Sequence, residues 1–186
     1  GCISWIVLFL YDIRLFLLTL WSHRHVSALA HFFSGSNKEA LKHDDIMPVV
    51  MSCLSMGKQK VGALIVIEHT TPLDEVVRTG EIIDATISQR LIENIFFKNS
   101  PLHDGAMVIS KKRIKAAGCI LPVSHDLNIP KELGLRHRAA MGISQKSDAH
   151  AIIVSEETGS ISVAYRGQFY LRLNAEELES LLTKDN

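Results

Sequence analysis

Apolar residues run without a break through Gly62-Ala63-Leu64-Ile65-Val66-Ile67-Glu68 and stop at a carboxylate. A run of this kind, rich in β-branched side chains and without polar alternation, is typical of a strand buried on both faces. We expect helices both before and after this strand in the chain. Further strands are expected over 106–110, 114–121 and 151–155. The sequence therefore predicts an α/β fold, a three-layer domain with a central β-sheet flanked by helices.

Capping residues, apolar spacing and breakers predict the remaining elements. We expect a helix over 46–56 with Asp44 or Asp45 as its cap, and a helix over 89–97 with Ser88 as its cap. A third helix is expected over 138–144, and a last helix, capped by Asn174 with Glu177, should end at Leu182. Strands over 161–165 and 169–173 are expected to form a hairpin, and 125–134 a loop. Because hairpin strands are antiparallel, we expect a mixed sheet.

The N-terminal segment, residues 3–21, is apolar apart from Ser4, Asp12, Arg14 and Thr19. A membrane-spanning helix needs roughly 20 mostly apolar residues, and charges at its midpoint are costly. We therefore expect 3–10 to be the end of a membrane helix that leaves the bilayer at Asp12 and Arg14. The alternative is a soluble amphipathic helix that packs on a partner or on the domain. Gly1 in place of Met suggests a cut fragment, so this chain is expected to lack most of an anchor.

Composition limits the classes of function. The chain has 186 residues, 47% of them hydrophobic, and its 20 basic and 20 acidic side chains balance to zero net charge. This balance argues against binding of a nucleic acid duplex, which requires a basic face. The three cysteines are Cys2, Cys53 and Cys119. They lie too far apart in the sequence for a zinc motif, and their number and spacing suit a protein of a reducing compartment. The polar stretch 34–37 predicts a boundary between a helical segment, 1–37, and one domain, 38–186.

The first polar motif is Leu102-His103-Asp104-Gly105-Ala106. The carboxylate of Asp104 is a hard ligand for Mg²⁺ or Mn²⁺, and the imidazole of His103 would favour Mn²⁺ or Co²⁺. Gly105 is expected to let a ligand approach the backbone. The alternative is an ordinary turn, because Asp-Gly is a common turn dipeptide.

The second polar motif is Gly134-Leu135-Arg136-His137-Arg138-Ala139-Ala140. At the start of a helix, Arg136, His137 and Arg138 would surround an N-terminus whose dipole also favours phosphate. The two neighbouring cations are expected to keep His137 neutral. The alternative is a solvated basic turn.

A third stretch, Ser155-Glu156-Glu157-Thr158-Gly159, follows the strand predicted at 151–155. Glu156 and Glu157 could complete a metal site, and Ser155 could donate a hydrogen bond to phosphate, although most such turns are solvent faces. The sequence has no Walker A and no GxGxxG motif, which excludes an ordinary nucleotide-binding loop. It also lacks the second carboxylate cluster of a nuclease-like metallohydrolase. The three stretches together indicate a site for a polyphosphate with a divalent cation.

Asp104-Gly105-Ala106 and Arg136-His137-Arg138 resemble the paired DGA and RHR motifs of the diadenylate cyclase family. The resemblance covers Asp44 to Leu182, and its further matching pieces are Gly62 to Glu68, Gly80 with Ile83-Asp84, Leu121-Pro122, and Ser155 to Gly159. The most similar subgroup is the membrane-anchored cyclic di-AMP synthases. Tyr11 to Phe16 resembles the segment that follows their last membrane helix.

This resemblance implies a DAC fold and an enzyme that condenses two ATP molecules into the bacterial second messenger cyclic di-AMP, with release of two pyrophosphates. Two protomers would face each other as a homodimer, without nucleic acid as a partner, and each 3′-hydroxyl would attack the facing α-phosphate. The implied location is a bacterial cell membrane, with the catalytic domain on its cytoplasmic side. A non-catalytic nucleotide-binding or scaffold module of the same fold is the alternative.

Site roles follow from the same resemblance. The implied catalytic residues are Asp104, Arg136 and His137. The implied nucleotide-binding residues are Gly105, Ala106, Leu121, Leu135, Arg136, His137, Arg138 and Ser155. The divalent metal, Mn²⁺, Mg²⁺ or Co²⁺, would be held by His103, Asp104, Glu156 and Glu157. Many family members carry Thr where this chain has Leu135, so one side-chain hydrogen bond of roughly 0.5–1.5 kcal/mol is expected to be missing.

Overall fold

The computed structural model describes residues 2–20, 41–124, 129–131 and 133–183. The chain divides into two compact units, Gly1–Ala40 and Leu41–Asn186. The boundary predicted at 37–38 lies outside the described residues.

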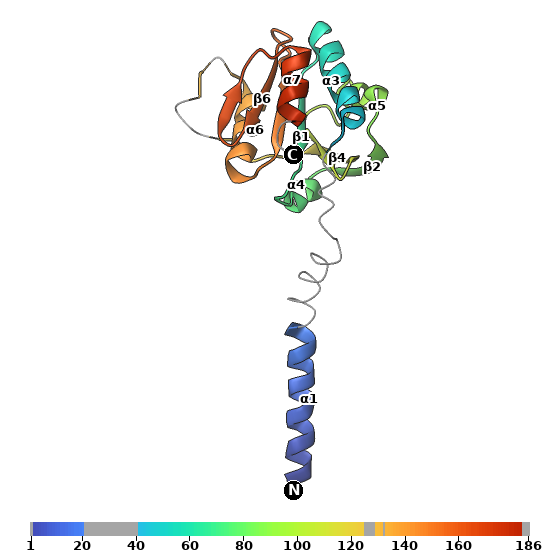
Figure 1. Ribbon diagram of the computed structural model, residues 1–186, viewed down its shortest axis with the longest axis vertical. Helices are drawn as coiled ribbons and strands as arrows, with labels where there is room; N and C mark the ends of the chain where they lie inside the picture. Colours follow the sequence, from blue (N-terminus) through green and yellow to red (C-terminus); the bar gives the residue numbers. More distant parts are fainter. Residues whose placement is uncertain (1, 21–40, 125–128, 132, 184–186) are drawn as a thin grey trace. The chain divides into compact units, whose positions relative to one another are not determined.

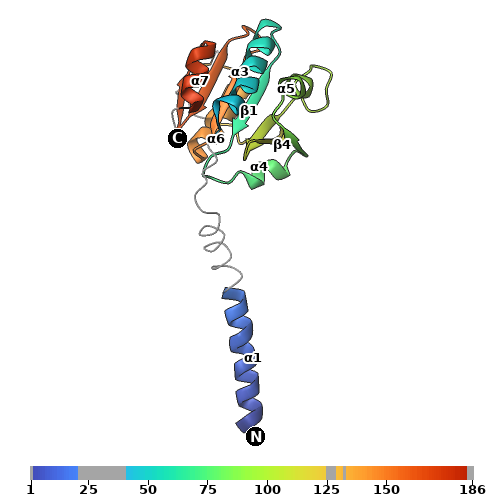
Figure 2. The ribbon, with the colours of Figure 1, turned by 45° about the vertical axis from the view of Figure 1, so that its right-hand side comes forward.

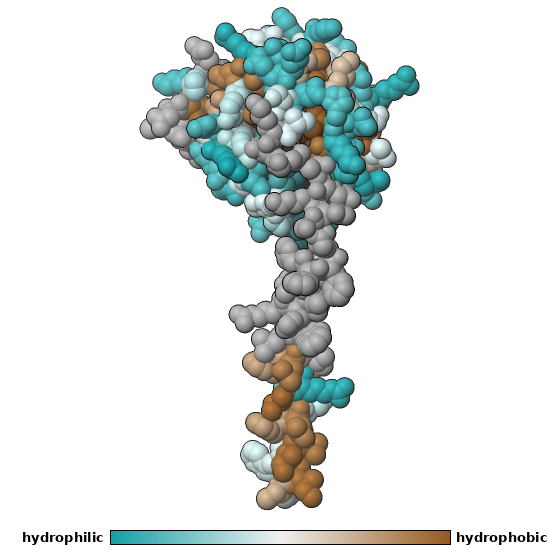
Figure 3. Space-filling model, in the orientation of Figure 1, coloured by the Kyte–Doolittle hydropathy of each residue, from teal (hydrophilic) through white to brown (hydrophobic). Residues whose placement is uncertain are grey.

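The first unit contains helix α1, Cys2–Leu20, which continues through Asp12 and Arg14 without interruption. Figure 3 shows this helix covered largely by apolar side chains, and many of them, such as Trp5 and Phe9, are exposed. Among the described residues, no helix has the length and apolar character needed to cross a membrane.

The second unit is built on one seven-stranded sheet in the order β2-β4-β3-β1-β5-β6-β7. Its strands are β1 Ala63–Ile67, β2 Glu81–Thr86, β3 Ala106–Ser110, β4 Arg113–Cys119, β5 His150–Val154, β6 Ile161–Tyr165 and β7 Gln168–Tyr170. Strands β1 and β3 are parallel, whereas every other neighbouring pair is antiparallel. The predicted mixed sheet is confirmed.

Helices cover both faces of this sheet (Figures 1 and 2). They are α3 His43–Lys58, α4 Asp74–Arg78, α5 Gln89–Ile95, α6 Leu135–Lys146 and α7 Ala175–Thr183. Buried residues of α3, α5 and α7 form a core with Ile65 and Ile67 of β1. Residues of α4 and α6 form a second core with Leu64 and Val66. Alternate side chains of β1 thus enter opposite cores, as expected for a strand buried on both faces.

Several predicted boundaries are wrong. Helix α3 begins at His43 after the cap position Lys42, so Asp44 and Asp45 lie in its first turn, where the carboxylate of Asp45 accepts a hydrogen bond from the Lys42 backbone at 3.3 Å. Strand β4 ends at Cys119 rather than at 121, and α6 begins at 135 rather than 138. The cap of α7 is confirmed, because Asn174 Oδ1 accepts the Glu177 N–H at 2.8 Å.

Two elements between residues 68 and 88, the short helix α4 and the edge strand β2, were not predicted. Strand β2 escapes a pattern search because its register with β4 shifts between Ile82 and Ala85, and Asp84 has a positive φ of 48°. The irregularity interrupts the period of two on which strand prediction depends. Residues 125–128 and 132 of the predicted loop lie outside the described residues.

Candidate active site

A cleft of about 1340 Å³ opens at one end of the sheet, where β1 and β3 begin and where β4 and β5 end. Among its lining residues are His103, Asp104, Gly105, Ala106, Leu121, Leu135, Arg136, His137, Ser155, Glu156 and Glu157. These are all the residues implied for the site except Arg138, which does not line the cleft. The fold therefore brings the three polar stretches of the sequence together.

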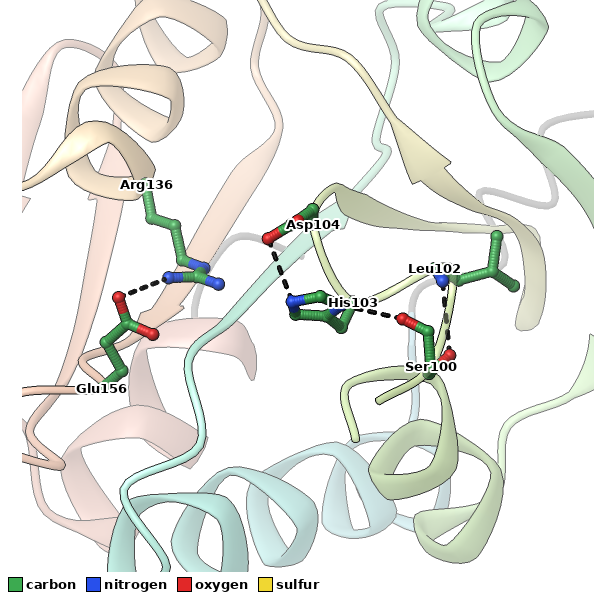
Figure 4. A network of polar contacts seen from close by, with 6 residues as sticks. All are labelled: Ser100, Leu102, His103, Asp104, Arg136 and Glu156. Atoms are coloured by element: carbon green, nitrogen blue, oxygen red, sulfur yellow. Dashed lines mark hydrogen bonds and ion pairs between the residues drawn. The ribbon is translucent and has the colours of Figure 1, made fainter. Parts of the chain in front are cut away.

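Asp104 and His103 lie on the turn that leads into β3. The carboxylate is well exposed, and its Oδ1 lies 3.1 Å from His103 Nε2. The other imidazole nitrogen, Nδ1, donates a hydrogen bond to the Ser100 carbonyl at 2.7 Å, since a carbonyl can only accept. Figure 4 shows the ring held between these two partners. In the neutral ring the hydrogen bond from Nδ1 leaves Nε2 unprotonated, which is the tautomer of a metal-binding histidine.

Gly105 also has a packing role that the sequence did not predict. A Cβ at this position would lie 2.5 Å from the backbone of Gly118, in β4. Gly118 has a positive φ of 65°, and its own Cβ would approach Leu102. The missing side chain of Gly105 thus permits close packing of β3 against β4, rather than serving only the approach of a ligand.

The start of α6 forms the opposite wall of the cleft. Gly134 occupies the N-cap and makes no side-chain cap, and Leu135, the first helical residue, is 76% exposed. Arg136 Nη1 lies 3.4 Å from Glu156 Oε1, and its side chain retains 25% exposure. Figure 4 shows Arg136 and Glu156 pointing toward each other. The backbone N–H groups of this first turn and the guanidinium suit an anion.

His137 is buried, with 7% exposure, and its ring meets Phe169 edge-on at a centroid distance of 6.2 Å. Burial lowers the pKa of His137, and the neighbouring charge of Arg136 lowers it further. The predicted neutral imidazole agrees with this direction, but burial rather than charge is the larger cause. Arg138 is not among the causes of the lowered His137 pKa, and it does not line the cleft.

The loop after β5 is fixed by its own hydrogen bonds. Ser155 Oγ accepts the N–H groups of Glu157 and Thr158 at 3.2 and 3.3 Å, which leaves its hydroxyl proton available to a ligand. Gly159 packs against Gly57 at the end of α3, where a Cβ on either glycine would overlap a carbonyl oxygen of the other. This loop therefore presents its polar groups on a rigid support.

The expected metal ligands are only partly brought together. His103 and Asp104 are adjacent, but Glu156 pairs with Arg136 instead. Among the described residues, no group of three or more His, Cys, Asp or Glu side chains is arranged to hold a metal ion. The structure offers a two-residue ligand pair rather than a complete cage, which suits a cation that is also held by substrate phosphates.

Sequence reasoning missed two features of the cleft. Gly62, which precedes β1, lies beneath the Arg136 guanidinium. Ile120, 71% exposed, lines the cleft beside Leu121. The first could have been suspected because a glycine opens a buried strand, whereas nothing in the sequence marks Ile120 as exposed.

Comparison with known proteins places the fold and the cleft in a family. The family model of the DAC domain, described as "DisA bacterial checkpoint controller nucleotide-binding", matches residues 50–169. The chain belongs to the DAC family. This confirms the resemblance to diadenylate cyclases. The matched range contains both polar motifs of the DAC domain and the loop at 155–159.

Curated relatives carry the same domain. The cyclic di-AMP synthase CdaA of Bacillus subtilis (strain 168) is 40% identical over 182 residues, which are 98% of this chain and 65% of that protein. A diadenylate cyclase of Listeria monocytogenes serotype 1/2a (strain 10403S) is 42% identical over 151 residues, which are 81% of this chain and 55% of that protein. This DAC chain thus spans less than two thirds of the length of either relative.

Solved structures show the same DAC fold. A double mutant of DacA from Staphylococcus aureus superposes with a TM-score of 0.74 at 46% identity, covering 76% of this chain and 94% of that one. A protein from Bacillus cereus, described as a hypothetical membrane spanning protein, gives a TM-score of 0.67 at 39% identity and covers 69% of this chain and 63% of that one. These similarities confirm the predicted fold class.

Proposed function

We propose that this chain is a diadenylate cyclase, which joins two ATP molecules into cyclic di-AMP and releases two pyrophosphates. One observation supports this above the others. In a chain of the DAC family, Asp104 and the first turn of α6 open onto the same cleft from opposite walls. Relatives that are 40% and 42% identical to this chain are named cyclic di-AMP synthase and diadenylate cyclase, which favours an enzyme over a non-catalytic scaffold.

The α6 wall would bind the triphosphate. Arg136 offers a guanidinium, the first turn offers backbone N–H groups, and Ser155 offers its hydroxyl proton from the neighbouring loop. His137, held neutral by burial, would donate or accept one hydrogen bond without adding charge. Positive groups placed where pyrophosphate departs stabilise the charge that develops in an in-line transfer. Leu121 would line the pocket for the adenine.

Asp104 would act on the attacking hydroxyl. In each half-reaction the 3′-oxygen forms a bond to the α-phosphorus, the bond from that phosphorus to the bridging oxygen breaks, and pyrophosphate leaves with the electron pair. The 3′-hydroxyl proton would leave toward the Asp104 carboxylate, which is exposed to the cleft beside His103. Much of the rate enhancement would come from positioning of the two reacting atoms.

A divalent metal fits the donor set, because His103 Nε2 and Asp104 Oδ1 lie 3.1 Å apart and the ring is held by its hydrogen bond to the Ser100 carbonyl. His103 and Asp104 would hold it, with Glu156 or Glu157 as a further carboxylate. When bound, Mn²⁺, Mg²⁺ or Co²⁺ lowers the pKa of a coordinated hydroxyl and offsets phosphate charge. Removal of metal with a chelator is expected to stop product formation.

The reaction would require two protomers. One cleft offers a single set of Asp104, Arg136 and His137, so each of the two new phosphodiester bonds needs a second cleft opposite the first. A two-fold homodimer is the simplest closed arrangement that supplies it. The exposed Leu135 and Ile120 line the cleft that a facing protomer would have to cover.

Attachment to a bacterial membrane, with the catalytic domain on the cytoplasmic side, is the proposed location. The apolar, exposed side chains of α1 support it, as does the description of the Bacillus cereus relative as a membrane spanning protein. We propose 3–10 as the end of an anchor. Flotation of this chain with lipid vesicles, compared with a Leu8→Lys/Phe9→Lys variant, tests the assignment, and equal flotation of the two would contradict it.

Mass analysis of the products formed from ATP and Mn²⁺ tests the proposed activity. We expect cyclic di-AMP and pyrophosphate in a ratio of one to two, and no product after addition of a chelator. An intact ATP pool would instead support the non-catalytic nucleotide-binding module. Release of inorganic phosphate without cyclic di-AMP would indicate a hydrolase.

A further inference from the structure

Gly62 lies directly against the guanidinium of Arg136. A Cβ at this position would be 2.7 Å from Arg136 Cζ, 2.7 Å from Nη1 and 3.1 Å from Nη2, and these are its nearest neighbours. Real Cβ atoms do not approach other atoms so closely, so the guanidinium occupies the space that any side chain at Gly62 would take. The contact joins residues that are far apart in the sequence.

Sheet register explains why the contact occurs. Strands β1 and β5 are antiparallel, with Ala63 opposite Val154, so the chain just before β1 lies level with the chain just after β5. Arg136 begins on α6, above this sheet end, and reaches Glu156, which lies two residues beyond Val154. The straight path from the helix to the carboxylate passes over Gly62.

We infer that Gly62 is a positioning residue for Arg136, because its bare backbone forms the slot in which the guanidinium lies flat while it pairs with Glu156. The inference rests on the proposed function for the statement that Arg136 then meets a phosphate. Gly62 acts through Arg136 and contributes no reacting group. Glycine here serves the placement of a charge rather than a turn.

The backbone itself does not require glycine. The glycines with positive φ among the described residues are Gly118, Gly159 and Gly167, so an alanine at Gly62 is conformationally allowed. The three atoms nearest to its methyl group would all belong to the far end of the flexible Arg136 side chain. Gly62→Ala is therefore expected to leave the fold intact and to move the guanidinium out of its slot, away from Glu156.

A double-mutant cycle tests this coupling. We would prepare Gly62→Ala, Arg136→Ala and the double variant, with Arg138→Ala and Gly62→Ala/Arg138→Ala as matched controls, because Arg138 does not line the cleft. Calorimetry would measure binding of ATP and of inorganic pyrophosphate, and steady-state kinetics would give KM and kcat. The NMR signal of the Arg136 Nε–H group would report the position of the side chain in the absence of any ligand.

Gly62→Ala is expected to weaken binding of both anions about tenfold, the order of magnitude of one charge-assisted hydrogen bond. It should shift the Arg136 Nε–H signal and leave the unfolding temperature within about 1 °C of the parent. In the Arg136→Ala background it should have no further effect on binding. In the Arg138→Ala background its full effect should remain.

Equal weakening by Gly62→Ala with and without Arg136 would overturn the inference, as would an unshifted Arg136 signal. Loss of folding of Gly62→Ala both with and without Arg136 would overturn it too, because the methyl group would then clash with something other than the guanidinium. If the chain binds ATP but forms no cyclic di-AMP, the proposed activity fails while the cycle still measures the positioning. A parent chain that binds neither anion contradicts both.

Discussion

Asp104 combines exposure to the cleft with a fixed neighbour, because His103 is held from behind by the Ser100 carbonyl. The Asp104→Asn variant keeps the shape of the side chain and removes the charge that a cation and a departing proton both require. We expect the variant to bind ATP with nearly normal affinity and to lose at least about a hundredfold in turnover, as is common when a general base is removed. Calorimetry and product analysis measure the two effects separately.

Asp74→Asn provides the matched control. Asp74 forms a surface ion pair with Lys115 at 3.6 Å and lies outside the cleft lining. Its replacement by the same amide should leave turnover unchanged. Near-normal turnover of Asp104→Asn would reduce Asp104 to a turn residue and would contradict the mechanism.

Replacement of Leu135 tests the site by an expected gain of turnover rather than a loss. The side chain is 76% exposed at the first position of α6, so its removal creates no cavity. Leu135→Thr should therefore leave stability almost unchanged and should restore a hydroxyl beside the phosphates, with equal or faster turnover. Steady-state kinetics measure the outcome. A severe loss of turnover would mean that the facing protomer or the pocket has adapted to leucine.

At the scale of elements, the close packing of β3 against β4 determines the position of Asp104. A methyl group on Gly105 would lie 2.5 Å from backbone atoms of Gly118, which cannot move aside as a side chain can. We expect Gly105→Ala to lower the free energy of unfolding by about 1–3 kcal/mol, the usual cost of overpacking, and to displace the Asp104 turn. Urea unfolding measures the stability.

Gly134→Ala is the control for this prediction. A Cβ at Gly134 meets nothing within 4 Å, and the residue lies at the cap of α6 with a negative φ. Gly134→Ala should lower the free energy of unfolding distinctly less than Gly105→Ala does, because its effect is limited to the poorer helix capping by alanine. Equal destabilisation by the two variants would show that close packing of β3 on β4 is not what requires Gly105.

At the scale of the whole molecule, activity should depend on protein concentration. If each phosphodiester bond needs two facing clefts, the rate per protomer rises with concentration and then saturates. Rate measurements over a dilution series, with sedimentation at matched concentrations, provide the comparison. Constant specific activity far below any detectable dimer would contradict the face-to-face arrangement.

The local sequence pattern was sufficient to predict most helices and strands of the domain. The runs that become β1, β3 and β5 are apolar because they are buried on both faces, and burial of that kind leaves a direct mark on composition. The motifs likewise drew attention to Asp104, Arg136 and His137, but their roles followed from the resemblance to the diadenylate cyclase family rather than from side-chain chemistry alone. Strand β2, an exposed edge with an irregular register, left no such mark.

Only the tertiary structure decided how these groups meet. The register of β1 on β5 places Gly62 under Arg136 and sets Glu156 within reach of the guanidinium. The early start of α6 at Leu135 places His137 in the interior and leaves Arg138 outside the cleft lining. Such contacts join segments far apart in the chain. They depend on strand register and helix rotation, which shift whole side chains between faces while leaving local composition unchanged.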